Sequence, residues 1–492
     1  MKTFFSKFGK YFAIVLLSLI GLCAVGVLYL FFVPNSNIFG ICYISYNKNF
    51  DSSTYSVDEN AINSIALNTR DYDIEVKTSP TSSKDVYVRV YSNSFGFVLK
   101  KHSQVNIDAK LLTGDLTFNI SEPYGACFKN RSKITLFVPE NFDVDLKLNN
   151  KNATTDIDGE KLKIKNLSAT TNNGEFNLNQ CSIAENISVT LNRGNFTFGE
   201  KVATNRNAVE LNTNTGNFYA QNVELGNVEI KSNFRAMIKI KKCVRFNLSN
   251  KSAGGSLEIG EVDELVASSS DTNISVNKIN AGAVVNLSTS GKISVNEICA
   301  NTTISTHDGD IYVGKVDANT IWLKTTGNGN INLNNANASV MADTKYGNIN
   351  VKFDTNSSSY STSTNSRKLQ VSTTNGKVYT TDVENLDVNI SGNGSAEIYM
   401  SNVLGENKIE TKSGNVYVQF ADASSFVLNT KSDNNVANIN CLQFTQIGEQ
   451  NHIFSGNKTF NINTPSENGN SLTILSSSGY LKVRDFSTRE TA

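Results

Sequence analysis

A short pattern of alternating polar and apolar residues recurs along most of the chain. Each copy has a Thr or Ser, a turn that ends in Gly, and then a further alternating stretch. Counted from the Gly, apolar or small residues recur at positions +2, +4 and +7, and the same parity continues upstream. Alternation with period two predicts strands that bury one face and expose the other. Clear copies lie at residues 170–178, 211–220, 305–313, 373–380 and 411–418.

The glycines of this pattern are regularly spaced, as in the series Gly291, Gly309, Gly329 and Gly347. A fixed period near 20 with alternation inside it is typical of stacked β-rungs, each of which is stable only against its neighbours. The sequence therefore predicts an all-β, single-chain β-solenoid (β-helix) with rungs of about 18–22 residues, in preference to an array of ordinary β-sandwiches. We expect the turn glycines to adopt positive φ.

The N-terminal region has a different character. Residues 11–33 form a stretch of 23 residues without a charged side chain, which exceeds the roughly 20 needed to cross a bilayer. Lys2, Lys7 and Lys10 precede this stretch. The positive-inside rule then predicts a single-pass transmembrane helix in the cell membrane, with a cytoplasmic stub at 1–10 and an extracellular solenoid. The alternative is a cleaved signal peptide, although the apolar region of such a peptide is usually about 7–15 residues long.

The rest of the chain divides into regions that differ in their pattern of polar and apolar residues. Residues 34–60 are polar and predict a linker, and residues 61–140 look like strands out of repeat register, which predicts an irregular N-terminal β-cap. Regular solenoid rungs are expected at 141–440, and a C-terminal cap and tail at 441–492. The Ser/Thr-rich segment 354–368 stretches one repeat and predicts a loop that leaves the rung.

Charge and cysteine content narrow the classes of function. Lys+Arg and Asp+Glu both number 45, so the formal net charge is zero. Without a basic stripe, the sequence predicts no nucleic-acid partner. The cysteines are scattered and never form a C-x-x-C pair, which argues against a zinc site. Cys181 falls in an inward slot, and we expect it to be a small buried hydrophobe.

One turn carries residue types that occur in catalytic sites. Asp308 and Asp310 flank Gly309, and the neighbouring His307 is a candidate base. Catalytic sites on β-helices need two or three carboxylates, or a base and a cation, that converge from adjacent rungs. The equivalent positions of neighbouring rungs hold Lys292 and Asn330, so no carboxylate ladder forms. We interpret the group as an ordinary Asp-Gly turn and predict no catalytic residue.

The sequence also argues against a calcium site. Residues 325–333 resemble calcium-binding nonapeptide rolls, but Asn330 stands where those rolls need an Asp, and the period is about twice too long. No dinucleotide, phosphate-loop or nucleophile-elbow motif lies in a suitable context. The sequence therefore predicts neither a metal nor a cofactor.

The outward positions of the rungs carry several tyrosines. Position +3 lies between two inward positions and holds Tyr219, Tyr312, Tyr379 and Tyr417, while Tyr399 lies in the rung between the last two. Because stacked strands are about 4.8 Å apart, we expect Tyr379, Tyr399 and Tyr417 to form an exposed aromatic ladder suited to a cell-surface glycan or protein. The alternative is that these tyrosines only stabilise neighbouring strands.

The region 134–178 combines three features in order. A strand reaches the pair Val138-Pro139, an alternating strand follows, and then come rungs with Thr-x-x-Gly turns. In these features the chain resembles a bacterial putative-adhesin family of unknown biochemical function, over most of residues 61–486. The resemblance implies a membrane-anchored or exported β-helical domain with a surface role, and it supplies no catalytic residues.

Two functional hypotheses follow from the sequence. The favoured one is a membrane-anchored, extracellular, adhesin-like protein that is not an enzyme and has a binding or envelope-associated role. The alternative is a β-helical carbohydrate-active enzyme, either a polysaccharide lyase or a hydrolase, which would need a carboxylate cluster.

Overall fold

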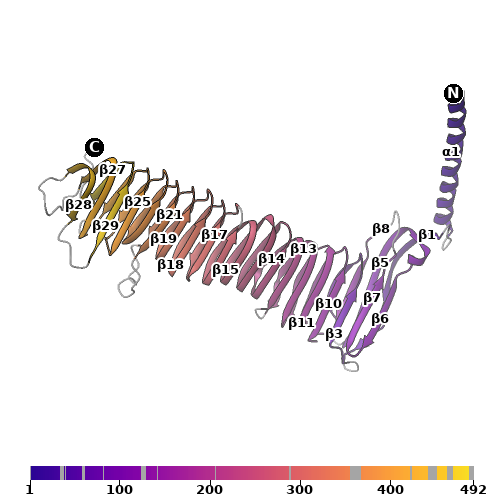
Figure 1. The fold of residues 1–492 in the computed structure, drawn as a ribbon. Coiled ribbons are helices and arrows are strands. Elements are labelled where there is room, and N and C mark those ends of the chain that lie inside the picture. Colours follow the sequence, from indigo (N-terminus) through magenta and orange to yellow (C-terminus); the bar gives the residue numbers. More distant parts are fainter. Residues whose placement is uncertain are drawn as a thin grey trace. The chain divides into compact units, whose positions relative to one another are not determined.

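The chain forms two compact units, Met1–Asn207 and Ala208–Ala492. The computed structural model describes residues 2–33, 38, 40–57, 61–80, 83–123, 129–140, 142–204, 207–287, 290–354, 367–421, 424–440, 451–462 and 469–486. Apart from one N-terminal helix and a short 3-10 turn, the described elements are strands (Figure 1). This confirms the all-β solenoid class and the N-terminal apolar helix that the sequence predicts.

The described part of the first unit holds the helix, the 3-10 turn and the first strands. Its elements are α1 (Lys2–Phe32), β1 (Ile41–Asp51), β2 (Tyr55–Ser56), β3 (Ser64–Asn68), β4 (Asp73–Thr78), β5 (Asp85–Leu99), the 3-10 turn η1 (Lys100–His102), β6 (Asn106–Leu112), β7 (Asp115–Ser121), β8 (Lys129–Asn130), β9 (Lys133–Val138), β10 (Val144–Asn150), β11 (Thr155–Asn173), β12 (Phe176–Ile183) and β13 (Asn186–Thr204).

The described elements of the second unit are all strands. They are β14 (Ala208–Ser232), β15 (Ala236–Leu287), β16 (Ile293–Ile298), β17 (Thr302–Thr306), β18 (Ile311–Thr325), β19 (Ile331–Thr344), β20 (Ile349–Phe353), β21 (Lys368–Thr373), β22 (Val378–Val383), β23 (Asn385–Ile390), β24 (Ala396–Met400), β25 (Glu406–Thr411), β26 (Val416–Phe420), β27 (Phe426–Asn440), β28 (Asn451–Ile462), β29 (Ser471–Ser476) and β30 (Leu481–Asp485).

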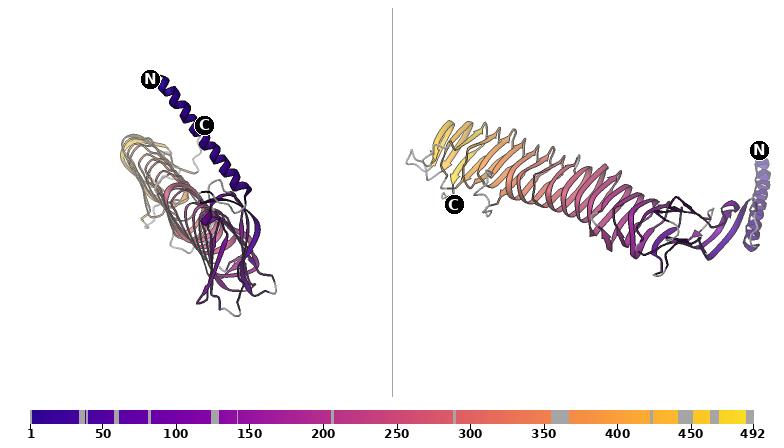
Figure 2. Two further views of the ribbon diagram at one scale, coloured as in Figure 1. Left: turned by 90° about the vertical axis from the view of Figure 1, so that its right-hand side faces the viewer. Right: turned by 90° about the horizontal axis from the view of Figure 1, so that it is seen from below.

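Each rung of the second unit contributes a stretch of strand to each of two sheets, in which neighbouring strands are parallel. Figure 2 shows these rungs stacked within that unit. We call the sheet that contains β16, β20, β22, β24, β26 and β30 the first sheet. The second sheet contains β17, β21, β23, β25 and β29, and the long strands β18 and β19 pass through both sheets. Equivalent residues pair at the predicted period, since Ile293 lies opposite Ile311, and Ile311 opposite Ile331.

The hydrophobic core lies between the inward faces of the two sheets. In β16, for example, Ile293 and Val295 are fully buried, and Ser294 between them points outward. The same alternation is repeated in the following strands, so the apolar side chains of successive rungs stack on one another. No rung could exclude water from this face alone, which is why the strands are stable only as a stack.

The threonine of the recurring pattern explains how the chain turns from the second sheet into the first. Thr373 is buried, and its hydroxyl oxygen accepts a hydrogen bond of 3.0 Å from the backbone N–H of Gly376. Thr344 and Gly347 repeat this bond at 3.0 Å. The Thr344 hydroxyl also donates to the carbonyl oxygen of Gly329 in the preceding rung, at 3.1 Å. Thr therefore satisfies polar backbone groups that the turn would otherwise bury unpaired.

The glycine of the pattern has a different role from the one expected. Gly309, Gly347 and Gly376 do not adopt the left-handed backbone conformation, so the prediction of positive φ is wrong for these turns. Instead, successive turns approach so closely that a Cβ added to Gly376 would overlap the carbonyl oxygen of Gly347. The same overlap would occur between Gly414 and Gly394. Glycine is needed here for close backbone approach.

The far end of the second unit departs from sequential stacking. β25 is followed in space by β29 rather than by β27, because Ile409 lies opposite Ile474. β29 pairs in parallel with β27 on its other side, and β28 adds to β27 in antiparallel orientation. The rung formed by β29 and β30 therefore lies between two earlier segments of the chain.

The beginning of the first unit uses the same arrangement. β3 lies between β7 and β10, and β4 lies between β9 and β11, all in parallel. The antiparallel strand β6 covers β7, and the antiparallel strand β5 covers β9. At each of these ends, an antiparallel strand covers a parallel edge that would otherwise expose unpaired backbone groups.

Several predicted features can now be located. The segment 34–60, expected as a linker, contains β1, which pairs along its whole length with β5. The predicted loop 354–368 lies largely outside the described residues. Cys181 is buried as predicted, with 3% of its surface exposed. Burial also raises the pKa of the Cys181 thiol to about 12, so it is protonated at neutral pH.

Candidate functional site: a tyrosine cluster on the first sheet

The three tyrosines that the sequence singles out lie together on the outer face of the first sheet, and we call Tyr379, Tyr399 and Tyr417 the tyrosine cluster. Their strands β22, β24 and β26 are neighbours. Tyr379 lies opposite Glu397, and Glu397 lies opposite Tyr417. Tyr399 is two residues further along its strand, so the rings form a staggered group rather than a straight ladder.

The rings are nevertheless in contact. The centroids of Tyr379 and Tyr399 are 5.8 Å apart, and those of Tyr399 and Tyr417 are 5.9 Å apart. Both pairs are tilted, at 57° and 58°. All three side chains are half-buried, because each ring packs against its neighbours while part of its surface remains open to solvent. Tyr399 is the central member and contacts both of the others.

An ion pair lies among the rings. The ammonium group of Lys377 is 2.6 Å from the carboxylate of Glu397, and the hydroxyl group of Tyr399 donates to the same carboxylate at 2.9 Å. The hydrogen bond from Lys377 is the main reason that the pKa of Glu397 is lowered. Burial, together with the hydrogen bond to Glu397, raises the pKa of Tyr399 to about 12. At neutral pH, Glu397 is therefore ionised and Tyr399 is neutral.

A second polar group lies at the Tyr417 end. The hydroxyl group of Tyr417 donates to the amide oxygen of Gln419 at 3.2 Å, and the guanidinium group of Arg484 donates to the same oxygen at 3.3 Å. Arg484 also lies over the Tyr417 ring, with its central carbon 5.0 Å from the centroid. The site thus combines aromatic surface with a carboxylate, an amide and two cationic groups.

Sequence reasoning missed the polar half of this site. Lys377 and Glu397 occupy outward positions that look like ordinary solvated charges in the repeat. Arg484 lies outside the repeat pattern altogether. Its strand β30 lies beside β26 only because the last rung is out of sequence order, and in this pairing Tyr417 lies opposite Lys482. A regular period gives no signal for a neighbour that comes from a much later part of the chain.

The other outward tyrosines do not join the cluster. Tyr312 lies three rungs before Tyr379, with Asn332 and Asn350 between them in the register, and its hydroxyl accepts a hydrogen bond from Asn334 at 2.8 Å. Tyr219 lies in β14, where its hydroxyl is 3.6 Å from the sulfur of Met237.

The candidate catalytic turn is engaged in bonds between rungs. One carboxylate oxygen of Asp308 accepts from the backbone N–H of Asn328 at 2.9 Å. One oxygen of Asp310 accepts from the backbone N–H of Asn330 at 2.8 Å and from its side-chain amide at 3.0 Å. His307 contacts the hydroxyl of Thr326 through Nδ1, at 2.5 Å. These side chains hold adjacent turns together, which is the role expected of an Asp-Gly turn.

The segment 325–333, considered above for calcium, covers the end of β18, the following turn and the start of β19. Its Asn330 continues the same chain of bonds, because the side-chain oxygen accepts from the backbone N–H of Asn348 at 2.9 Å. Within the part of the chain that the structure describes, no group of three His, Cys, Asp or Glu side chains is placed to hold a metal ion.

Comparison with known proteins identifies a family. The family model described as Toastrack DUF4097 matches residues 62–235 and 256–373. A crystal structure of a putative cell adhesion protein from Clostridium sporogenes is similar over 89% of this chain and 100% of that one, with 9% identity and a TM-score of 0.18. A putative adhesin from Bacteroides fragilis is similar over 90% of this chain and 99% of that one, with 10% identity and a TM-score of 0.16. No curated protein matches the chain.

Proposed function

The chain belongs to the Toastrack DUF4097 family, and we propose that it is a membrane-anchored surface protein that binds glycans through the tyrosine cluster without catalysing a reaction. The observation that carries the proposal is the contact of three half-exposed rings, with centroids 5.8 Å and 5.9 Å apart, beside a carboxylate and an amide. Rings of this kind offer apolar faces to sugar rings. Polar groups at their edges can accept hydrogen bonds from the hydroxyl groups of the sugar or donate hydrogen bonds to them.

The absence of catalysis is part of the proposal. Glycosidases flank the scissile bond with two carboxyl groups. In the tyrosine cluster, Glu397 is held in an ion pair with Lys377, and the low pKa of this carboxyl group does not suit a general acid. Asp308 and Asp310 use carboxylate oxygens to bond the next rung. These observations favour a binding surface over the alternative of a polysaccharide lyase or hydrolase.

Anchoring by α1 is supported by its length and composition. The 24 residues Gly9–Phe32 include a window with a mean hydropathy of 2.7, and among the described helices α1 alone could cross a membrane. A signal sequence near the N-terminus can also be long and apolar, although the apolar region of a signal peptide is usually about 7–15 residues. With three lysines before the apolar stretch, the N-terminus is cytoplasmic and the β-structure extracellular in our proposal.

The binding proposal can be tested with full-length protein in nanodiscs, applied to arrays of cell-wall glycans and host matrix proteins. Replacing Tyr379, Tyr399 and Tyr417 together by Ser should lower the affinity for bound glycans at least tenfold. The matched control replaces Tyr219 and Tyr312 by Ser and should bind like the wild type. Equal binding by a folded cluster variant would contradict the proposed site, and release of cleaved polysaccharide would contradict the non-enzymatic proposal.

The anchor has its own test. Carbonate and high-salt washing should leave the protein in the membrane pellet, and protease added to intact cells should remove the β-structure. Recovery of a shortened mature chain in the medium would instead identify the N-terminal segment as a cleaved signal sequence.

A further inference from the structure

The ribbon formed by β1 and β5 changes from apolar to polar along one face. Near α1, the paired residues on this face are Ile41 with Leu99, Tyr43 with Phe97, and Ser45 with Phe95. Further along, the pairs become Asn47 with Asn93, Asn49 with Tyr91, and Asp51 with Arg89. Ile41, Phe95 and Leu99 are each more than 40% exposed, which is unusual for three large apolar side chains on one short surface.

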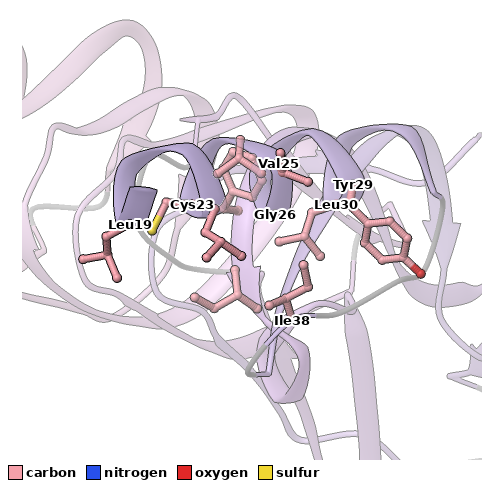
Figure 3. Close-up of a pocket in the computed structure, with 11 residues that line it drawn as sticks. Leu19, Cys23, Val25, Gly26, Tyr29, Leu30 and Ile38 are labelled. Atoms are coloured by element: carbon pink, nitrogen blue, oxygen red, sulfur yellow. The ribbon is translucent and has the colours of Figure 1, made fainter. Parts of the chain in front are cut away.

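The apolar end of this ribbon lies beside α1. The ring of Phe31 is 4.7 Å from that of Tyr43, which in turn is 5.4 Å from Phe97. Between helix and ribbon lies an open groove of about 770 Å³, which Figure 3 shows from close by. Its lining is apolar and continuous with the exposed surface of the helix. The lining residues are Leu19, Leu22, Cys23, Val25, Gly26, Val27, Tyr29, Leu30, Ile38, Ile41 and Phe97.

Two lysines follow the apolar pairs at the same end of the ribbon. Lys100 and Lys101 are exposed, and neither forms a salt bridge with a described residue. The backbone N–H of Lys100 donates to the carbonyl oxygen of Gly40 at 2.8 Å, which fixes the lysines beside the start of β1. Together with Leu99, they line a smaller groove of about 460 Å³.

We propose that this end of the β1–β5 ribbon docks onto the bilayer surface, on the side of the membrane that holds the β-structure. Ile41, Phe95, Phe97 and Leu99 enter the boundary between headgroups and acyl chains, and the acyl chains fill the groove beside α1. Lys100 and Lys101 contact anionic headgroups. The inference rests on the proposed anchoring by α1, and it assigns a lipid-contact function to a segment that follows the anchor.

The known preferences of side chains at membrane surfaces support a lipid bilayer as the partner of this ribbon. Aromatic side chains concentrate at the membrane–water interface, where one end of the ring is apolar and the other is wet. Lysines near the surface are attracted to anionic lipids, and their aliphatic stems remain in the apolar region. In the ribbon, the apolar and aromatic residues lie at the end next to Lys100 and Lys101, and the same face becomes polar after three residue pairs. A second copy of the chain would not need the lysines or the continuity with α1.

Tryptophan fluorescence in liposomes can measure the depth of the ribbon. Trp322 is the single tryptophan of the chain, so Trp322→Phe provides a silent background for full-length protein reconstituted into phosphatidylcholine–phosphatidylglycerol vesicles. Three reporters are then placed one at a time, as Phe97→Trp on the apolar end, Tyr91→Trp on the polar part of the same face, and Leu19→Trp on α1. Brominated lipids quench only tryptophans that lie within the bilayer. Phe95→Trp serves as a second reporter if the first variant does not fold.

The expected result is strong quenching at positions 97 and 19 and little at position 91. Quenching at 19 alone would overturn the ribbon proposal and leave the anchor intact, whereas no quenching at 19 would overturn both. Equal quenching at 91 and 97 would also contradict the proposed depth. Changing Lys100 and Lys101 to Glu should reduce quenching at 97 in anionic vesicles by at least half. Quenching at 97 that is unchanged by these substitutions would overturn the headgroup contact.

Discussion

The Thr-x-x-Gly turn and the tyrosine cluster both belong to the rungs of the second unit, but different constraints hold them. In the turn, Thr373 is buried and Gly376 touches the backbone of the preceding rung, so both residue types are required by packing. The tyrosines occupy outward positions where other rungs carry Ser294 or Asn332 without loss of the register. The turn is therefore determined by the fold, while the outer surface is available for function.

The largest effect is expected from filling the space at a turn. Gly376→Ala would place a Cβ against the carbonyl oxygen of Gly347, and relief requires movement of the backbone. We expect a loss of about 3 kcal/mol in the free energy of unfolding, measured by chemical denaturation. Thr374→Ala, in the same turn, is the matched control and should change stability by no more than about 0.5 kcal/mol. A Gly376→Ala protein as stable as the control would contradict the close-approach explanation.

A smaller loss is expected from the buried hydroxyl group. Thr373→Val keeps the shape of the side chain but leaves the N–H of Gly376 without its acceptor. The expected cost is about 1–3 kcal/mol. Thr373→Ser retains the hydroxyl group and should lose less than the Val variant. If the two variants have equal stability, the turn depends on the shape of the threonine and not on its hydrogen bond.

On the outer surface, we expect substitutions of the tyrosine cluster to affect binding more than folding stability. Tyr399→Ser removes both ring contacts of the cluster, and we expect a cost of about 1 kcal/mol. Tyr312→Ser lies outside the cluster and should cost less. Thermal denaturation compares the two variants. A loss at Tyr399 as large as that of Gly376→Ala would mean that the cluster is a structural element, and the comparison with the turn would fail.

The last effect is a dependence on pH. Because the pKa of Tyr399 is raised from 10.0 to about 12 in the folded protein, the unfolded chain ionises first as pH rises. The contribution of this phenol to folding stability is therefore lost progressively as pH rises from about 10 to about 12. Tyr399→Phe should reduce this alkaline loss, as measured by denaturation at pH 9 and pH 11. An identical loss in both proteins would show that the phenol titrates normally.

The sequence was sufficient to predict the solenoid because the constraint is local and repeated. Each Gly marks a turn, and the alternation around it identifies the buried face, as Ile293 and Val295 illustrate. The reason for the glycine was not predictable, since close approach between rungs depends on the backbone of the preceding rung. The composition of the site was only half predictable. The period identified Tyr379 and Tyr417, whereas Arg484 reaches Tyr417 only through a rung that is out of sequence order.

The strands that cover β25 and β26 are the last to be made, because β29 and β30 follow β27 and β28 in the chain. Between Phe420 and Ser471 lie about 50 residues, which take roughly 3 to 10 s to translate. Before β29 and β30 are in place, β25 and β26 lack their final partners, and an unpaired edge can recruit strands from other chains. A chain that ended before residue 471 would lack both of these covering strands. Arrival of the last rung therefore closes this edge.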